Sequence, residues 1–105
     1  VYIGEKPTKV EDRGNDHGYR YELHQNYPNP FNPGTNIRFE IPHAGFVSLK
    51  VFDLLGRKIA TLVDEERPAG SYIAQWNAEG FPSGVYFVQL ASGDFRRVKK
   101  VILNK

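Results

Sequence analysis

The side chains that most often perform catalysis or bind metals are spread along this chain without a shared motif. The histidines are His17, His24 and His43, and none stands at a metal-ligand spacing from another histidine or from a carboxylate. The carboxylates of Asp64–Glu66 form one charged run, which is more typical of a solvated loop than of an acid–base pair. No serine lies in a nucleophile motif, and the chain has no cysteine. The sequence therefore predicts a protein that is not an enzyme, with no metal, no cofactor and no small-molecule substrate.

Aromatic side chains could instead form a carbohydrate-binding surface. Tyr72 and Trp76 alternate with polar residues and share a face with Ala74, while Tyr86 shares one with Val88 and Leu90. Such positions predict a core between two sheets rather than an open platform. The predicted exposed aromatics, Phe46, Phe52 and Phe81, are scattered in sequence.

The net charge of +2 conceals a basic end. Residues 94–105 hold five Lys or Arg residues against Asp94 alone, a net charge of +4. Such a segment suits a phosphate-rich partner or, more simply, an edge strand that lysines protect against unwanted pairing. Apart from Phe95 the segment lacks interleaved aromatic residues, so no nucleic-acid partner is predicted.

The elements that must position these residues are strands. Apolar and polar residues alternate over residues 37–41, 47–51, 72–76 and 86–90, less regularly over 59–63 and 95–104, and a short strand is expected near 21–25. Asp53–Gly56 is typical of a hairpin turn, and the charged stretch Asp64–Arg67 of a loop. We therefore predict one all-β domain, an immunoglobulin-like antiparallel β-sandwich of about seven strands, over residues 21–105. Residues 1–20 mix charges with Gly, Asn and Pro and are interpreted as an arm from an upstream domain.

A proline-rich segment precedes the first clear strand. Pro28, Pro30 and Pro33 each fix φ, remove a backbone donor and restrict the preceding residue, so the segment is stiff and cannot join a sheet centrally. We expect a brace whose aromatic residues, Tyr27 and Phe31, plug one end of the sandwich. Two interpretations stay open: a stiff structural loop with a low ordering cost, or a rigid surface that a partner recognises.

Four stretches in order carry a resemblance to a known family. "LHQNYPNPFNPGTNIRFEIP", "VSLKVFDLLGRKIATLV", "AGSYIAQWNAEGFPSGVYFVQL" and the final "KKVILNK" resemble the type A C-terminal sorting domain of the type IX secretion system, over residues 21–105. The fold of that family is similar to the immunoglobulin-like domain of flagellar hook-capping proteins. The resemblance implies a secretion signal that carries an upstream cargo through the periplasm and an outer-membrane translocon to the cell surface or the medium. It also implies a sortase-like peptidase that removes the domain.

The resemblance supplies candidate recognition residues where the family's recurrent motifs match this chain. They are Pro28, Asn29, Pro30, Phe31, Asn32, Pro33, Gly84, Tyr86, Lys99, Lys100, Val101, Leu103 and Lys105. We expect the three lysines to make the electrostatic contacts with the secretion machinery. Val101–Leu103 is expected to supply strand addition or a docking edge.

Two other functions remain as alternatives. One is a carbohydrate-binding accessory module of a secreted glycoside hydrolase, which would bind insoluble polysaccharide. The other is a passive immunoglobulin-like spacer, although the final "VILNK" is expected to be a chain end, whereas spacers usually lie in mid-chain.

Overall fold

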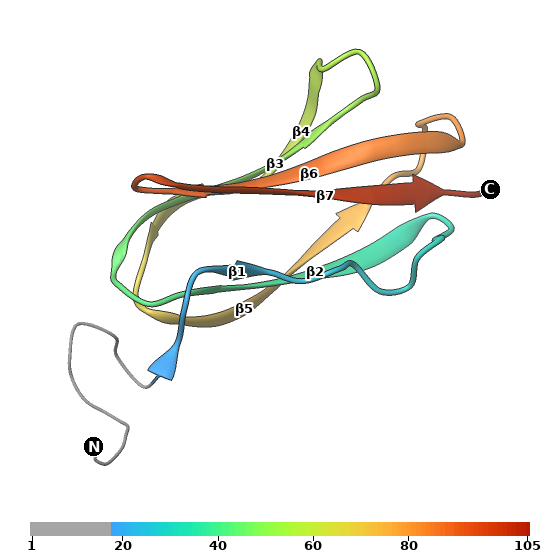
Figure 1. Cartoon of the computed structure of the whole chain (residues 1–105). Helices are drawn as coiled ribbons and strands as arrows, with labels where there is room; N and C mark the ends of the chain where they lie inside the picture. The colour runs from blue at the N-terminus through green and yellow to red at the C-terminus, as the bar shows by residue number, and fades with distance from the viewer. Residues whose placement is uncertain (1–17) are drawn as a thin grey trace.

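The computed structural model describes residues 18–105, which form two packed β-sheets (Figure 1). The predicted arm, residues 1–20, lies outside the described residues except for its last three, and so does His17. A three-stranded sheet has the order β1-β2-β5 and a four-stranded sheet the order β4-β3-β6-β7, with every neighbouring pair antiparallel. The strands are β1 (Glu22–Leu23), β2 (Gly34–Ile41), β3 (Gly45–Phe52), β4 (Lys58–Arg67), β5 (Gly70–Asn77), β6 (Gly84–Ser92) and β7 (Phe95–Leu103).

Period-two alternation explains why these segments are strands and where the core lies. In β2, β3 and β6 the buried side chains stand at every second position, because successive side chains of a strand point to opposite faces, and all of them except Thr35 and Ser92 are apolar. The two inner faces meet and form one core. Its largest fully buried members are Phe39, Ile37, Ile41, Leu49, Leu90, Leu103, Val47, Val51, Val88 and Val101.

The connections identify the kind of sandwich. The chain passes from one sheet to the other between β2 and β3, between β4 and β5, and between β5 and β6. Tyr86, near the start of β6, donates its hydroxyl to the carbonyl oxygen of Pro82 over 2.6 Å. A tyrosine bonded to the backbone a few residues upstream at this strand is a hallmark of immunoglobulin-like domains. The predicted all-β sandwich of seven strands is confirmed.

One predicted loop is wrong. Asp64–Arg67, expected to be a charged loop, continues β4 and pairs with the beginning of β3. The charged side chains are tolerated because β4 is an edge strand of its sheet and exposes them to water. Irregular register between β3 and β4, at Leu49/Lys50 and Val51/Phe52, breaks the alternation from which a strand would have been recognised.

The two ends of the sandwich are built from different segments. At one end the chain enters β1, and Tyr21 stacks on Phe95, the first residue of β7, with the ring centroids 4.8 Å apart. At the other end β2 and β6 begin, and β3, β5 and β7 finish. Figure 1 shows this second end at the right, with the β3–β4 hairpin rising above the other strands. Within residues 18–105, no helix has the length and apolar character needed to cross a bilayer.

Candidate functional site

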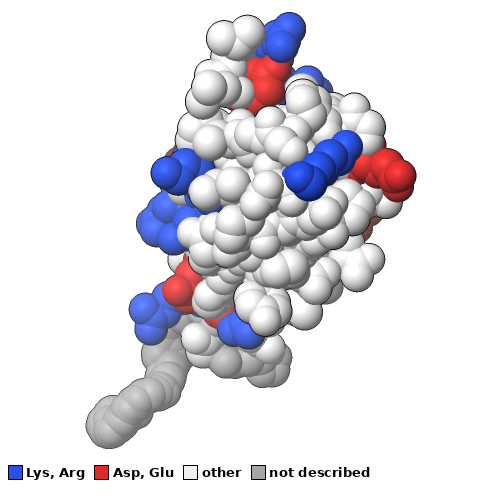
Figure 2. All heavy atoms as spheres, turned by 90° about the vertical axis from the view of Figure 1, so that its right-hand side faces the viewer, with Lys and Arg blue, Asp and Glu red and all other residues white. Residues whose placement is uncertain are grey.

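Most of the predicted recognition residues gather at the end where β7 finishes, which we call the end face. The end face comprises the proline loop (residues 26–33), the tip of the β3–β4 hairpin (53–57), the β5–β6 loop (78–83) and the end of β7 with Lys105. Figure 2 views the molecule from this side and shows a broad uncharged area with both basic and acidic side chains around it. Segments that are some 70 residues apart in sequence thus form one surface, as the hydrogen bond between Asn29 and Ile102 shows directly.

Phe31 anchors the proline loop to the core. Its side chain is only 2% exposed and lies against Trp76, with the ring centroids 5.6 Å apart. The prediction that an aromatic residue of this loop plugs the sandwich is therefore confirmed for Phe31. It is wrong for Tyr27, which is 78% exposed. Tyr27 forms an antiparallel bridge with Asn36, and this pairing leaves its ring outside the core.

The proline loop also covers the edge of the last strand. The amide of Phe31 donates to the carbonyl oxygen of Ile102 (3.0 Å), and the amide of Asn104 donates to the carbonyl oxygen of Phe31 (2.9 Å). The Asn29 side chain accepts the amide of Ile102 (3.0 Å), and Gln25 donates to the carbonyl oxygen of Lys100 (2.8 Å). Strand addition at Val101–Leu103 would require this loop to leave, so the edge is not open in the way that the sequence suggested.

Two buried polar residues, Asn26 and Thr35, close the base of the proline loop through hydrogen bonds. Asn26 Nδ2 donates to the Pro28 carbonyl oxygen and to Thr35 Oγ1, both over 3.0 Å. Thr35 Oγ1 donates in turn to the same Pro28 oxygen over 2.8 Å. Both side chains are buried, and buried polar groups persist when their hydrogen bonds are made. Sequence reasoning missed Asn26 and Thr35, because an isolated Asn or Thr beside prolines looks like an ordinary turn residue.

The candidate residues divide into exposed and buried sets. The exposed or half-exposed ones are Pro28, Asn29, Pro30, Asn32, Pro33, Gly84, Lys99, Lys100 and Lys105. The buried ones are Phe31, Tyr86, Val101 and Leu103. Phe31, Val101 and Leu103 are therefore withdrawn from the surface and hold the exposed residues in place, whereas Tyr86 borders a cleft in the end face.

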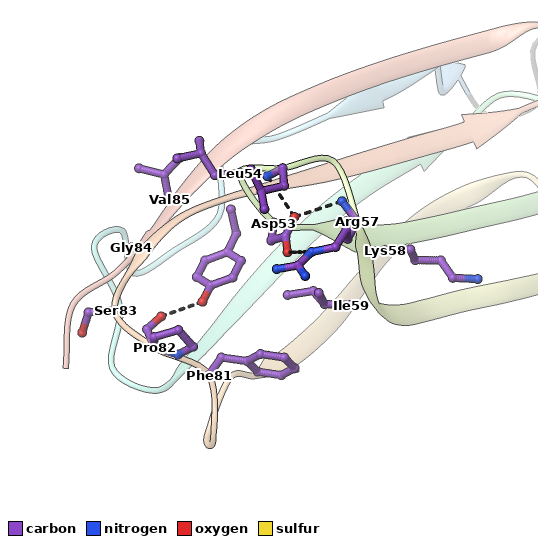
Figure 3. A pocket seen from close by; sticks show the side chains of 12 residues that line it. Asp53, Leu54, Arg57, Lys58, Ile59, Phe81, Pro82, Ser83, Gly84 and Val85 are labelled. Atoms are coloured by element: carbon purple, nitrogen blue, oxygen red, sulfur yellow. Dashed lines mark hydrogen bonds and ion pairs between the residues drawn. The ribbon is translucent and has the colours of Figure 1, made fainter.

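A cleft of about 570 Å³ opens in the end face between the β3–β4 hairpin and the β5–β6 loop (Figure 3). Ile59, Phe81, Pro82 and Val85 supply apolar walls. The lip is formed by Leu54, which is 69% exposed, and by Leu55, next to it at the hairpin tip. Exposed consecutive leucines beside an apolar cleft are typical of a contact surface.

The hairpin tip is held rigid by Asp53. Its carboxylate accepts the amides of Leu55 and Arg57, both over 2.9 Å, and Nε of Arg57 over 2.7 Å. The hydrogen bond from the backbone amide of Arg57 is the largest cause that lowers the pKa of Asp53 below its ordinary value, and the Arg57 guanidinium and the Leu55 amide act in the same direction. The turn is thereby fixed from within and presents its leucines outward.

Tyr86 closes the inner side of the cleft. Burial raises the pKa of its phenol above the ordinary value, and the negative charge of Asp53 adds to this effect. The hydroxyl therefore remains neutral and donates to Pro82, as the dashed line in Figure 3 marks. The sequence pattern Pro-x-Gly-x-Tyr occurs twice, and Tyr72 likewise donates to Pro68 over 2.5 Å at the opposite end.

A histidine does approach two carboxylates, contrary to the sequence prediction. Possible ligand atoms of Glu22, His24 and Glu40 lie within 4.8 Å of one another. Spacing along the chain could not reveal this, because Glu40 reaches the pair from the neighbouring strand, directly opposite Glu22. Arg38 also lies 3.8 Å from Glu40 and offsets part of the negative charge, and a half-buried cluster of this kind does not by itself define a metal site.

The aromatic residues that could have bound a sugar are committed to packing. Trp76 and Tyr86 are buried in the core, where their ring centroids are 5.4 Å apart. Tyr72 is half-buried and packs on Phe39. Of the predicted exposed aromatics, Phe46 is exposed, whereas Phe52 is half-buried and Phe81 packs against the core. The carbohydrate-binding alternative therefore loses Trp76 and Tyr86 as candidate residues.

Comparison with known proteins identifies a family. A family model described as "Secretion system C-terminal sorting domain" matches residues 25–104, nearly the whole of the folded part. No relative among the curated proteins matches the chain.

Proposed function

Since the chain belongs to the family of type IX secretion C-terminal sorting domains, and acts as a cargo's sorting signal for export to the cell surface or the medium, we propose that the end face is the surface by which the exporter reads it. The observation that carries this proposal is the convergence of the proline loop, the start of β6 and the end of β7. Motifs from three distant parts of the sequence meet in one place at this end.

The position of the end face suits a signal that travels with many different cargoes. The chain enters the domain at the opposite end, where Tyr21 contacts Phe95 and His43. A cargo attached upstream therefore leaves the end face accessible during passage through the periplasm. A rigid end face also favours recognition, because a preformed surface loses little conformational entropy on binding.

Within the end face we assign the exposed side chains as contacts. Pro28, Pro30 and Asn32 present the rigid loop, and Lys105, whose amide donates to Ser83 Oγ over 3.0 Å, adds a positive charge beside it. Lys99 and Lys100 lie on β7 and extend the positive charge along that strand. Positive charge at a rim accelerates encounter with an acidic partner.

A secretion assay tests the end face. The chain is fused to the C-terminus of a reporter in a bacterium that has a type IX system, and Lys105→Glu is compared with Arg96→Glu, at the other end of the same basic segment. We expect the first substitution to retain the reporter inside the cell and the second to leave secretion unchanged, although both alter the net charge equally. Equal secretion by both variants would contradict the proposal. Substitutions are preferable to deletion of 99–105, which would also remove Val101 and Leu103 from the core.

We also propose that a sortase-like peptidase removes the domain by cleavage within residues 1–20, upstream of the strands. Support comes from the fold, because from Tyr21 onward the side chains pack into the sandwich and a cut there would break the core. The mass of the released reporter tests this proposal. A reporter that ends within residues 1–20 is expected, and one that retains Lys105 would contradict it.

A further inference from the structure

A second apolar hollow lies on the outer surface of the four-stranded sheet, beside the end face. It has a volume of about 300 Å³, and we call it the sheet groove. Its apolar lining comes from three strands and the hairpin tip: Phe52, Phe87, Val98 and Leu54. Phe52 and Phe87 stand directly opposite each other across β3 and β6, and Val98 of β7 stands opposite Gln89.

These side chains have no place in the core. They alternate along their strands with the buried residues Val51, Val88 and Val101 and so point to the other face of the sheet. Val98 is 49% exposed. A contiguous exposed apolar surface on one side of a small domain is typical of an interaction site.

The charges around the sheet groove are nearly all positive. Lys100 stands directly opposite Phe87, and Lys50 directly opposite Gln89, so both border the groove on the same face. Among the described residues, the groove is lined by a single carboxylate, Asp53, which already accepts three hydrogen bonds from Leu55 and Arg57.

The acidic residues of this face lie at its other half. Asp64 and Glu66 on β4 stand opposite Ser48 and Phe46, near the start of β3. The half of the sheet that contains the groove therefore presents apolar surface with a positive border, and the far half presents a mixture of charges.

We propose that the sheet groove binds an extended segment of an export-machinery protein in which apolar side chains alternate with carboxylates. Apolar side chains of the segment occupy the groove, and its carboxylates pair with Lys50 and Lys100. The amide of Gln89, which lines the groove, is available to the backbone of an extended segment. A concave site with a polar amide suits the side chains and the backbone of an extended polypeptide. The identity of the partner rests on the proposed function, whereas the binding chemistry does not.

Peptide binding measured by NMR tests the chemistry with the 105-residue chain. The probe is a ten-residue peptide of alternating Leu and Asp, and the matched controls carry Ser or Lys in place of Asp. We expect the Leu–Asp peptide to shift the amides of Phe52, Leu54 and Val98 and to bind at least five-fold more tightly than the Leu–Ser peptide. Equal binding by all three peptides, or shifts at another surface, would overturn the proposal.

Three variants locate the binding. Lys100→Glu is expected to weaken binding of the Leu–Asp peptide at least five-fold and to favour the Leu–Lys peptide. Leu54→Ser should weaken binding of both. Phe46→Ser, which alters an exposed aromatic residue on the far half of the same sheet, should change neither. If Lys100→Glu leaves the peptide preference as it is, the charge argument fails.

Two further measurements decide the class of partner. Vesicles of phosphatidylcholine with phosphatidylglycerol are expected not to shift the groove amides, and binding of the groove to them would replace the protein partner with a membrane. In the reporter assay, Lys50→Glu, which borders the sheet groove and lies outside the end face, should reduce secretion. If it does not, while Lys105→Glu does, the groove is no exporter contact and the proposed role of the end face still stands.

Discussion

The two ends of the sandwich are closed by different means. Where the chain enters the domain, β2, β4 and β6 each lead to the next strand through a short turn, at residues 42–44, 68–69 and 93–94. At the end face the connections are longer, and the proline loop crosses to the last strand and pairs with it. Long segments at a domain end are usually mobile, yet here they are fixed by a buried ring and backbone hydrogen bonds.

This difference agrees with the role proposed for the end face. Short turns at one end satisfy the backbone with few residues and offer little specific surface. At the end face, two buried polar residues, Asn26 and Thr35, and one buried aromatic residue, Phe31, hold the proline loop in place. A shorter turn could join the same strands without them. A loop held in this way suits a surface whose shape must be constant, as recognition of a sorting signal requires.

Removal of the Phe31 ring should have the largest effect of any single change at the end face. Phe31→Ala is expected to lower the free energy of unfolding by about 3–5 kcal/mol, because it deletes a buried ring and leaves a cavity beside Trp76. Phe46→Ala, near the other end, removes an exposed ring and should change it by less than about 0.5 kcal/mol. Urea unfolding of the 105-residue chain measures both.

Amide hydrogen exchange tests whether Phe31 holds the proline loop on β7. If Phe31 holds the proline loop on β7, the amides of Ile102 and Asn104 should exchange faster in Phe31→Ala, relative to the amides of β3, than in the unaltered chain. Uniform acceleration of all amides would mean that Phe31 supports the core without holding the loop.

Loss of the hydrogen bonds that close the base of the proline loop should have the next largest effect. Asn26→Ala removes the donors to Pro28 and Thr35 and is expected to cost about 1–3 kcal/mol, because buried partners lose hydrogen bonds. Ser92→Ala, which removes one bond to the Phe46 carbonyl oxygen near the other end, should cost about 1 kcal/mol. A larger loss from Ser92→Ala would reverse the comparison.

The sequence predicted the parts of this fold that follow from alternation. The strand cores of residues 37–41, 47–51 and 86–90 are confirmed, because a strand with one buried face must alternate. The irregular stretch at residues 58–67 was only partly predicted, since its last four residues are charged and their pairing depends on β3. An edge strand exposes its side chains to water and also leaves the backbone on its outer side unpaired, so its sequence is weakly constrained.

The end face was harder to predict than the strands. The candidate segments in it were identified by resemblance, but no local pattern tells which aromatic of the proline loop enters the core, Tyr27 or Phe31. That choice depends on the space beside Trp76, which comes from another strand. The bonds from Asn29 and Phe31 to Ile102 join residues far apart in sequence, and the cluster of Glu22, His24 and Glu40 likewise forms only across strands.

The two Pro-x-Gly-x-Tyr corners allow a matched test of the two ends. Tyr86→Phe is expected to lower the free energy of unfolding by about 0.5–1.5 kcal/mol, because the Pro82 carbonyl oxygen in a partly buried corner loses its donor. Tyr72→Phe removes an exposed bond to Pro68 that water can replace, and should cost less than about 0.5 kcal/mol. Urea unfolding distinguishes them, and equal losses would show that the two corners are equivalent.

The turn at Asp53 should have the smallest effect, and one that depends on pH. Its pKa in the folded chain lies below the ordinary 3.8, so between those two values the unfolded chain binds more protons and the stabilisation falls as the pH falls. Asp53→Asn is therefore expected to lower the melting temperature at pH 6 and to lose this deficit in stronger acid. Asp94→Asn, in the tight β6–β7 turn of the other end, is the control for loss of one carboxylate. A deficit for Asp53→Asn that stays constant into strong acid would show that Asp53 stabilises the turn through shape and not through its charge.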